Sequence, residues 1–222
     1  MGARCTLQHE ERLRASGFLR VAGVDEAGRG PWAGPVVVAA VILPEGFAHP
    51  LLNDSKKLSA RVRERVEKDL LGTPGLLSAV VEVSVEEIDS LNILRATHEG
   101  MRRAVRALPE RADHALIDGL PVRPFPIPHT ALVGGDGLSL SIAAASVLAK
   151  VARDRRMEAL DAEFPQYAFA RHKGYGTALH QARLKEYGVS GVHRRSFAPI
   201  RRLLEPSPVS GELGLYGEQA GR

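Results

Sequence analysis

Four acidic residues suit a metal site that acts on phosphate. Asp25 and Glu26 are adjacent and follow an apolar segment; Asp118 also follows one, and Asp136 stands in a glycine-rich segment. Carboxylate oxygens are the hard ligands that Mg²⁺ and Mn²⁺ prefer, and these ions keep waters and bridge to phosphate. Two adjacent acids after an apolar strand repel each other unless a cation lies beside them. A divalent-metal site is therefore the first hypothesis.

Each acid except the first pair also has a structural interpretation. Asp136 precedes a long apolar helix and would serve as its N-cap, which is the better interpretation of that residue taken alone. Asp118-Gly119 is an ordinary turn sequence. Asp154 follows Lys150 by four residues, which predicts an ion pair on a helix surface. The pair Asp25-Glu26 has no comparable structural explanation.

The glycines around the first pair do not form a nucleotide-binding loop. Residues 23–30 have P-loop glycine spacing but carry Arg29 and Gly30 where that loop needs Lys and Ser or Thr. A dinucleotide fingerprint has to open a helix, whereas two prolines lead here into a β-branched segment. His98-Glu99 lacks the second histidine of a metalloprotease. We expect none of these three kinds of site.

Apolar periodicity predicts the elements that must position the acids. Strands are expected at 19–24, 36–43, 76–83, 114–117 and 130–133, and helices at 59–71, 84–108, 139–160, 177–187 and 196–204. Ser59 is a predicted N-cap, and Ser84 with Glu87 has the form of a capping box. If the first and fourth strands are parallel neighbours, Asp25 and Asp118 come within reach of one ion.

Length and composition are those of one α/β domain. The chain has 222 residues, of which 44% are hydrophobic and 25% charged. Strands that alternate with helices predict a mixed β-sheet flanked by α-helices. One cysteine, Cys5, excludes an intrachain disulfide and a cysteine-based zinc site, and it fits a reducing cytoplasm. No apolar run approaches the roughly 20 residues that span a bilayer, so we expect a cytoplasmic protein without membrane contact.

Positive charge is concentrated in the C-terminal part of the chain. Between residues 170 and 203, eight lysines or arginines accompany one acid, Glu186, and three histidines lie among them. A solvated basic face explains this pattern as well as a phosphate-binding surface does. The phosphate-binding interpretation has a physical basis, because clustered cations gain free energy by releasing counterions from nucleic acid.

Five motifs, in order, resemble the type 2 ribonuclease H family of bacteria, ribonuclease HII. They are GVDEAGRGP at 23–31, NDSKKL at 53–58, IDG at 117–119, SIAAASVLAKVARD at 141–154 and HKGYGT at 172–177. The resemblance implies an α/β fold, the ribonuclease-H-like mixed β-sheet flanked by α-helices, with additional C-terminal helices. It spans 19–204, which we take as the catalytic domain after an N-terminal extension at 1–18. The tail at 205–222 bears Gly, Pro and Ser and lacks periodicity, so we expect it to be disordered.

The resemblance implies a reaction and the residues for it. The family's four active-site carboxylates correspond to Asp25, Glu26, Asp118 and Asp136, which overrides the cap interpretation of Asp136; its Lys-Gly-Asp pattern is Gly-Gly-Asp here. Two divalent ions, Mn²⁺ or Mg²⁺, would take part: one would activate the attacking water, and the other would stabilise the oxygen that leaves the ribose. The implied reaction is endonucleolytic hydrolysis of the RNA strand of RNA–DNA hybrids and at single ribonucleotides embedded in duplex DNA, leaving 3′-hydroxyl and 5′-phosphate ends.

Further residues are implied to contact the substrate. Gly28-Arg29-Gly30 matches the segment that contacts the ribose 2′-hydroxyl, the group that marks RNA. Tyr175 matches a tyrosine that stacks on the deoxyribose after the ribonucleotide. Lys56 and Lys57 are interpreted as phosphate contacts. We expect a monomer that binds RNA–DNA hybrids and ribonucleotide-containing duplex DNA.

Two other functions stay open at this point. Another nuclease or a recombinase of the same fold would share the clustered acids, but it would not need Gly-Arg-Gly and Gly-Tyr-Gly together. A non-catalytic module would bind nucleic acid through the basic C-terminal stretch. Such a module would not need the acids, which repel a phosphate backbone unless metal is bound.

Overall fold

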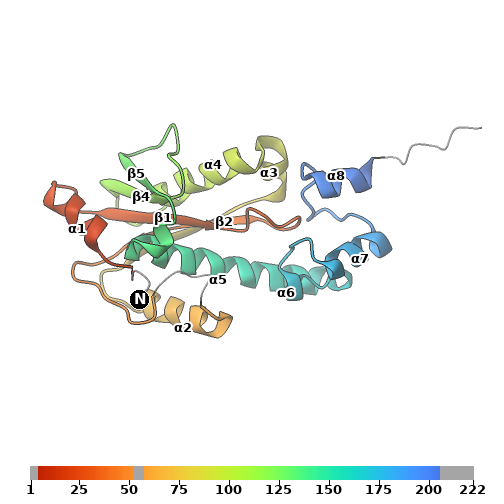
Figure 1. The fold of residues 1–222 in the computed structure, drawn as a ribbon, viewed down its shortest axis with the longest axis horizontal. Helices are drawn as coiled ribbons and strands as arrows, with labels where there is room; N and C mark the ends of the chain where they lie inside the picture. Colours follow the sequence, from red (N-terminus) through yellow and green to blue (C-terminus); the bar gives the residue numbers. More distant parts are fainter. Residues whose placement is uncertain (1–4, 53–57, 206–222) are drawn as a thin grey trace, which may run out of the picture.

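A five-stranded sheet forms the centre of the computed structural model, which describes residues 5–52 and 58–205 (Figure 1). Its strands are β1 Val21–Ala27, β2 Val36–Ile42, β3 Leu77–Val83, β4 His114–Asp118 and β5 His129–Leu132. The strand order is β3-β2-β1-β4-β5, with β1 in the middle. β2 pairs antiparallel with β1 and β3, whereas β4 pairs parallel with β1 and β5. The predicted mixed sheet is confirmed.

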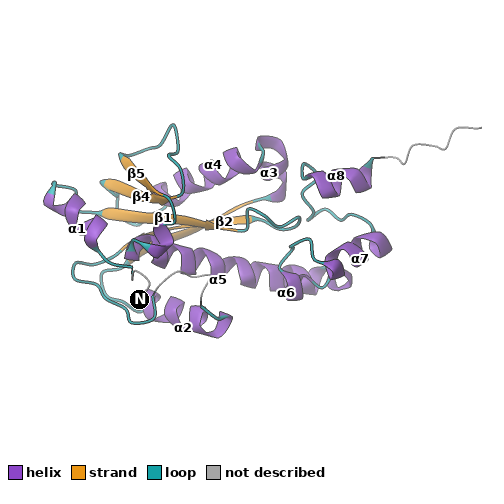
Figure 2. Ribbon diagram, viewed as in Figure 1, coloured by secondary structure: helices purple, strands orange, loops and turns teal. Residues whose placement is uncertain are grey.

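Helices cover both faces of this sheet (Figure 2). One face carries α2 Ala60–Leu71 and the long helix α5 Leu140–Glu163. The other face carries α3 Val85–Leu91 and α4 Ile93–Arg106. The sheet is therefore the middle layer of three, and its strand ends are the part left open for a site.

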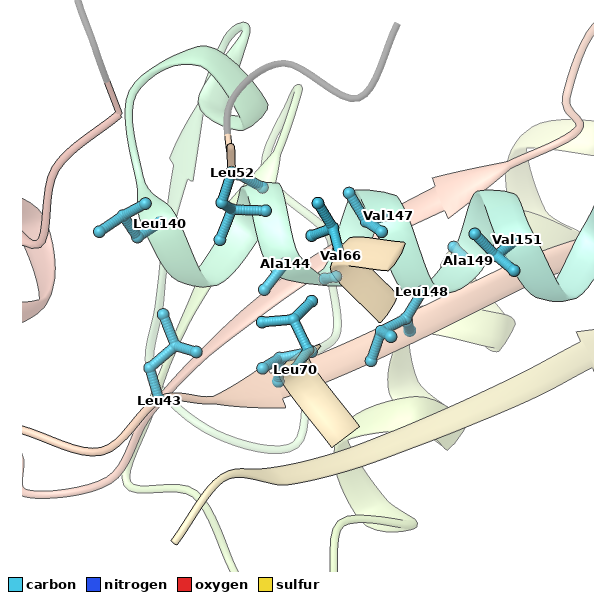
Figure 3. Packing of buried hydrophobic residues seen from close by; sticks show 14 of the residues in the cluster. Leu43, Leu52, Val66, Leu70, Leu140, Ala144, Val147, Leu148, Ala149 and Val151 are labelled. Carbon is cyan, nitrogen blue, oxygen red and sulfur yellow. The ribbon is translucent and has the colours of Figure 1, made fainter. Parts of the chain in front are cut away.

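β2 is apolar along its whole length because both of its faces are buried. Residues 37, 39 and 41 belong to the cluster under α2 and α5, whereas residues 36, 38, 40 and 42 belong to the cluster under α4. In the first cluster, Val66 and Leu70 of α2 lie near Ala144 and Leu148 of α5 (Figure 3). This packing fixes the position of α5 over the sheet.

A glycine brings the start of α5 close to β1. A Cβ on Gly23 would lie 2.1 Å from the backbone carbonyl carbon of Ser141, so any side chain there would push the helix away. Ser139 caps the helix by accepting a hydrogen bond from the amide of Ile142. The first half of α5 is buried throughout, as predicted. The N-terminal end of α5 thus lies over the strand that carries Asp25.

The single helix predicted at 84–108 is wrong, because α3 and α4 are separate helices. Asn92 lies between them with φ of 69°, which ends the first helix. Its side chain accepts hydrogen bonds from the amides of Leu94 and Arg95 and thereby caps the second. The capping box predicted at Ser84 is confirmed.

Short helices complete the two ends of the described chain. After α5 come η3 Pro165–Tyr167, α6 Phe169–His172, α7 Ala178–Tyr187 and α8 Ala198–Leu204, and before β1 lies α1 Gln8–Ala15. Buried residues of η3, α6, α7 and α8 share a cluster with the C-terminal half of α5. α7 and α8 were predicted, whereas α1, η3 and α6 were not: η3 and α6 are too short for a periodic pattern, and α1 has only Leu13 and Ala15 as apolar residues.

Some predictions fall on residues that the structure does not describe. Lys56, Lys57 and the predicted disordered tail, apart from Glu205, lie outside the described residues. Within the described ranges, no helix is both long enough and apolar enough to cross a membrane.

Candidate active site

Asp25 and Glu26 lie inside β1, and their predicted place in a turn after the strand is wrong. The antiparallel ladder to β2 continues past Val24 and pairs the two acids with Ala39 and Val38. The parallel ladder to β4 stops at Val24. Asp25 is only 4% exposed. β2 therefore holds both acids in extended backbone, at the point where β1 and β4 stop pairing.

Asp118 is brought to Asp25 because β1 and β4 run parallel. Val24 pairs with Ile117, so the next residue of each strand leaves the ladder at the same edge of the sheet. The predicted parallel pairing of these strands is confirmed. The Asp118 carboxylate also accepts a hydrogen bond from the amide of Gly135 at 2.7 Å. β4 is thus tied to the loop ahead of α5.

Asp136 lies in that loop, within the short helix η2 Gly135–Gly137. Gly134 precedes it in the left-handed conformation, with φ of 67°, which favours glycine. Asp136 is 4% exposed. Because Ser139 is the N-cap of α5, the interpretation of Asp136 as the cap of that helix is wrong.

Burial and like charge disfavour the ionised form of Asp25. Burial raises the pKa of its carboxyl well above the ordinary value, and the neighbouring Glu26 and Asp118 raise it further. Hydrogen bonds from the Ser146 hydroxyl and the Glu26 amide lower this pKa. A cation beside the carboxylates would favour the ionised form. Ser146 was missed from the sequence, although a serine inside the apolar half of a helix is a signal that could have indicated it.

The donor set suits a hard divalent cation, since all four candidate ligands are carboxylates. Three of them accept local hydrogen bonds: Asp25 from the Glu26 amide at 2.7 Å, Asp118 from Gly135, and Glu26 from the Arg29 guanidinium at 3.3 Å. Among the described residues, no three acidic, histidine or cysteine side chains are gathered as ligands around one point.

The segment Gly28-Arg29-Gly30 leaves β1 directly after the acids. Gly28 has φ of 96°, and a Cβ there would lie 1.9 Å from Nε of Arg153. The Arg29 side chain is 49% exposed. At Gly30 a Cβ would meet only the ring of Tyr175, at 3.6 Å. The structure therefore brings the predicted ribose-contacting segment and the predicted stacking tyrosine together.

Arg194 holds this segment from the inner side. Its guanidinium is fully buried and donates at 2.6–3.1 Å to four backbone carbonyls, those of Gly28, Arg29, Gly34 and Pro35. Burial, with Arg153 nearby, lowers the pKa of Arg194 to about 9, so it stays charged at neutral pH. The sequence predicted that Arg194 lies on an exposed basic surface, together with the other cations of residues 170–203. Its inward position is a correction that no local pattern indicated.

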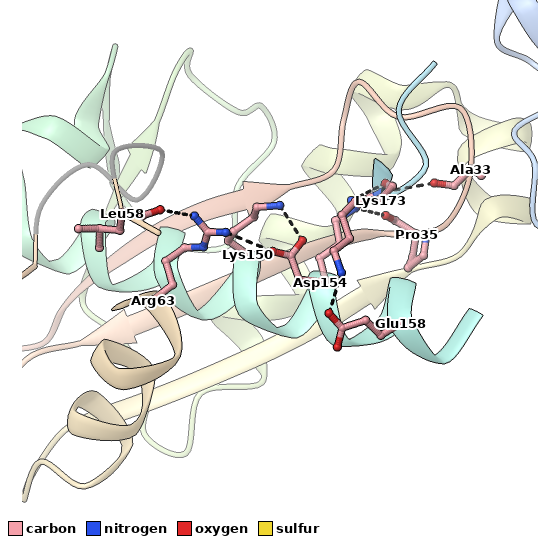
Figure 4. Close-up of polar contacts among 9 residues, drawn as sticks. Ala33, Pro35, Leu58, Arg63, Lys150, Asp154, Glu158 and Lys173 are labelled. Carbon is pink, nitrogen blue, oxygen red and sulfur yellow. Dashed lines mark hydrogen bonds and ion pairs between the residues drawn. The ribbon is translucent and has the colours of Figure 1, made fainter. Parts of the chain in front are cut away.

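Arg153, on α5, supports the other end of the same loop. It is 1% exposed and donates to the carbonyl oxygens of Ala33, Pro35 and Lys173, whose positions are labelled in Figure 4. Burial lowers its pKa to about 10. The two arginines together fix the backbone between β1 and β2, and they turn its carbonyl groups inward.

Tyr175 projects from the loop between α6 and α7 and is 47% exposed. The backbone of this loop is bound to the β1–β2 loop, because the amide of Trp32 donates to Gly174 at 2.8 Å. The Trp32 ring covers Gly176, where a Cβ would come within 2.1 Å of it. Trp32 thus serves packing between the two loops.

Three buried histidines support the Tyr175 loop. His172 accepts a hydrogen bond from the amide of Gly174 at 3.2 Å, and His180 lies 3.0 Å from the carbonyl oxygen of Tyr175. The Nε2 atoms of His180 and His193 are 3.1 Å apart, so one donates and the other accepts. Burial, reinforced by the neighbouring histidine, lowers the pKa of His180 and of His193 to about 4. These neutral histidines are part of the core, not of a phosphate-binding surface.

The ion pair predicted between Lys150 and Asp154 is confirmed, at 2.6 Å (Figure 4). Arg63 of α2 joins it at 3.4 Å. Asp154 therefore links α2 to α5 and is not a candidate ligand. Of the basic C-terminal residues, Lys173 pairs with Glu158 at 2.7 Å, and five side chains are exposed, those of Arg171, Lys185, Arg195, Arg201 and Arg202.

Comparison with known proteins identifies the family. A family model described as Ribonuclease HII matches residues 22–200. The chain is 50% identical over 198 residues to ribonuclease HII of Syntrophotalea carbinolica, covering 89% of this chain and 94% of that protein. It is 52% identical over 196 residues to ribonuclease HII of Rhodospirillum rubrum, covering 86% and 90%. The crystal structure of ribonuclease H2 from Pyrococcus horikoshii OT3 superposes with a TM-score of 0.71 at 26% identity, covering 83% and 97%.

The matched span contains the sheet, the four carboxylates, both buried arginines and Tyr175. Ribonuclease HII enzymes are endonucleases that hydrolyse the RNA strand of RNA–DNA hybrids and depend on divalent metal ions. With a family model over most of its length and relatives at half identity, the chain belongs to the ribonuclease HII family.

Proposed function

We propose that this endonuclease works with two divalent ions, Mn²⁺ or Mg²⁺, held by Asp25, Glu26, Asp118 and Asp136. We further propose that it nicks duplex DNA at single embedded ribonucleotides and leaves 3′-hydroxyl and 5′-phosphate ends. The observation that carries the proposal is the parallel pairing of β1 with β4, which brings the buried Asp25 and the partly buried Asp118 to the loop that bears a third acid, Asp136. We place the enzyme in the cytoplasm, as a monomer.

The chain itself orients the carboxylates. When bound, the ions would supply an activated water and stabilise the oxygen that leaves the ribose. Asp25 is fixed by the β2 ladder and by the hydroxyl of Ser146. Asp118 reaches across to the amide of Gly135, so the strand that carries one ligand also holds the loop that carries Asp136. Each proposed ligand thus has a rigid support, which metal sites need for affinity.

Recognition of ribose rests on the open glycine segment. Backbone groups of Gly28-Arg29-Gly30 reach a 2′-hydroxyl only where no side chain covers them. Arg194 takes the carbonyl oxygens on the inner side of this loop, which leaves its outer side to the substrate. The exposed ring of Tyr175 lies against Gly30, where it would stack on the following sugar. Lys56 and Lys57 remain proposed phosphate contacts.

The metal requirement and the position of the cut test this proposal directly. The chain is incubated with a DNA duplex carrying one ribonucleotide, an RNA–DNA hybrid and an all-DNA duplex, each with Mn²⁺, with Mg²⁺ and with excess chelator. We expect cutting of the first two only, with metal only, and a single 5′-phosphate product from the first. Binding of all three duplexes without any metal-dependent nick would favour the non-catalytic module.

Tyr175 is expected to matter most where DNA follows the ribonucleotide. Tyr175→Ala should slow cutting at a single ribonucleotide about 10- to 100-fold, since a stacking contact is worth roughly 1–3 kcal/mol, and should slow cutting of a continuous hybrid less. Tyr175→Phe keeps the ring and should retain most activity. Tyr187→Ala is the matched control, because this tyrosine is 48% exposed and lies on α7. Equal losses on both substrates would contradict the proposed stacking role.

A further inference from the structure

The described N-terminal residues before β1 are attached to the loop that carries Asp136. They precede the span matched by the family model, which begins at residue 22. Thr6 forms an isolated parallel bridge with Ser139; its amide donates to Leu138 at 3.2 Å, and its carbonyl accepts from Leu140 at 3.1 Å. The N-terminal segment, far away in sequence, thus pairs through one parallel β-bridge with the chain between η2 and α5.

Cys5 contacts Asp136 itself. Its thiol is buried, 6% exposed, and lies 3.1 Å from the carbonyl oxygen of Asp136. η2 is therefore held on two sides. Asp118 binds the amide of Gly135 from the sheet, and Cys5 binds the next carbonyl from the N-terminal segment.

Glu10 anchors this segment at the first turn of α5. The carboxylate is fully buried, and one oxygen accepts from the hydroxyls of Ser139 and Ser141, both at 2.6 Å, and from the Ser141 amide at 2.9 Å. A carboxylate at this end of a helix is favoured by the helix dipole and by the free amides there. A buried acid bound by three donors fixes α1 to the start of α5, and with it the loop immediately before.

We propose that Cys5, Thr6 and Glu10 form an N-terminal clamp that positions Asp136 for metal binding. The inference rests on the proposed function, since it takes Asp136 as a ligand. The sheet holds η2 through the hydrogen bond from the Gly135 amide to Asp118, and η2 is one short turn preceded by the left-handed Gly134. Without the clamp, that turn is free to rotate about Gly134 and to carry the Asp136 carboxylate away from Asp25 and Asp118.

The test measures Mn²⁺ affinity of the metal-free protein by calorimetry, together with amide hydrogen exchange at residues 135–141. Glu10→Ala is expected to weaken Mn²⁺ binding about 10-fold, as loss of a support for a ligand does, and to speed exchange in that segment. Glu10→Gln keeps the accepting oxygen and should recover most of the affinity. Glu11→Ala is the matched control: it removes an exposed acid from the same helix and should change neither reading. If Glu10→Ala does not fold, Cys5→Ala removes one donor and gives the same two readings.

The outcomes separate this proposal from the proposed function. Asp136→Asn provides the reference for loss of the ligand. If Asp136→Asn weakens Mn²⁺ binding while Glu10→Ala leaves affinity at the wild-type value, the proposed function stands and the clamp proposal is wrong. Faster exchange without a change in affinity would also overturn it, since a purely structural contact gives that result. If Asp136→Asn itself binds Mn²⁺ as the wild type does, Asp136 is not a ligand and both proposals fail.

Discussion

Replacing Asp25 by asparagine should reduce metal-dependent cutting of a duplex with one ribonucleotide by about 10³-fold or more, because the central carboxylate of the proposed site loses its charge. Asp25 is buried between Glu26 and Asp118, and asparagine has nearly the same shape. The loss should therefore appear in the single-turnover rate at saturating Mn²⁺. Binding of the duplex in chelator should stay within about twofold, since the proposed nucleic-acid contacts lie on other residues.

The same change should stabilise the metal-free protein. Burial and two like charges raise the pKa of Asp25, so keeping this group ionised at neutral pH costs folding free energy. Asparagine removes that cost, and each kcal/mol gained raises Tm by about 2–4 °C for a chain of this size. The gain should shrink as the pH falls and vanish below the ordinary aspartate pKa of about 3.9, where the group is protonated in both the folded and the unfolded state. Tm measured at pH 7.5 and at pH 4 tests this.

Asp113→Asn is the matched control for Asp25→Asn. Asp113 immediately precedes β4, at the end of the strand opposite Asp118, and it accepts a hydrogen bond from the Arg20 amide at 2.9 Å. We expect full activity and no stabilisation from this variant. If Asp25→Asn still cuts with metal at a rate within tenfold of the wild type, Asp25 is not a ligand.

The sheet and the convergence of two acids could be predicted because strands leave short-range patterns. Val36–Ile42 is apolar over its whole length and rich in β-branched residues, which indicates a strand buried on both faces. Acids after two such strands then meet if the strands are parallel neighbours. The exact end of β1 could not be predicted, because the antiparallel partner extends the strand through Asp25 and Glu26. That extension depends on pairing between distant segments, not on local preference.

The supports of the site were beyond sequence reasoning for the same reason. Arg194 and three histidines form a basic stretch in the sequence, and charge clusters normally face solvent. In the fold Arg194 points inward because carbonyls of the glycine-rich loop accept its hydrogen bonds, and the histidines are buried against backbone groups of their own neighbourhood. Glu10 lies on a helix that has almost no apolar residues to form a periodic pattern, and its partners are about 130 residues away. Only tertiary structure pairs such groups.

Arg194→Ala should affect both stability and ribose recognition. It removes a donor from four carbonyls of the β1–β2 loop, those of Gly28, Arg29, Gly34 and Pro35, of which, among the described residues, only Pro35 keeps a second hydrogen bond, from Arg153. Leaving such groups unpaired costs roughly 1–3 kcal/mol each before the loop relaxes, so we expect at least about 3 kcal/mol less unfolding free energy. Arg194→Lys should not rescue it, because an ammonium lacks the planar fork that reaches several acceptors at once.

The specific consequence of the released loop is a loss of discrimination between ribose and deoxyribose. The Gly28-Arg29-Gly30 backbone would no longer be preset, so KM for a single-ribonucleotide duplex should rise about tenfold or more. The affinity of the variant for the single-ribonucleotide duplex should approach its affinity for the all-DNA duplex. Its Mn²⁺ affinity should change little, since the carboxylates lie on β1, β4 and η2 and not on the β1–β2 loop. The assay is run well below the Tm of the variant, and Arg195→Ala, which truncates the exposed neighbouring side chain, is the control. A folded Arg194→Ala protein with wild-type discrimination would show that the loop keeps its shape without this guanidinium.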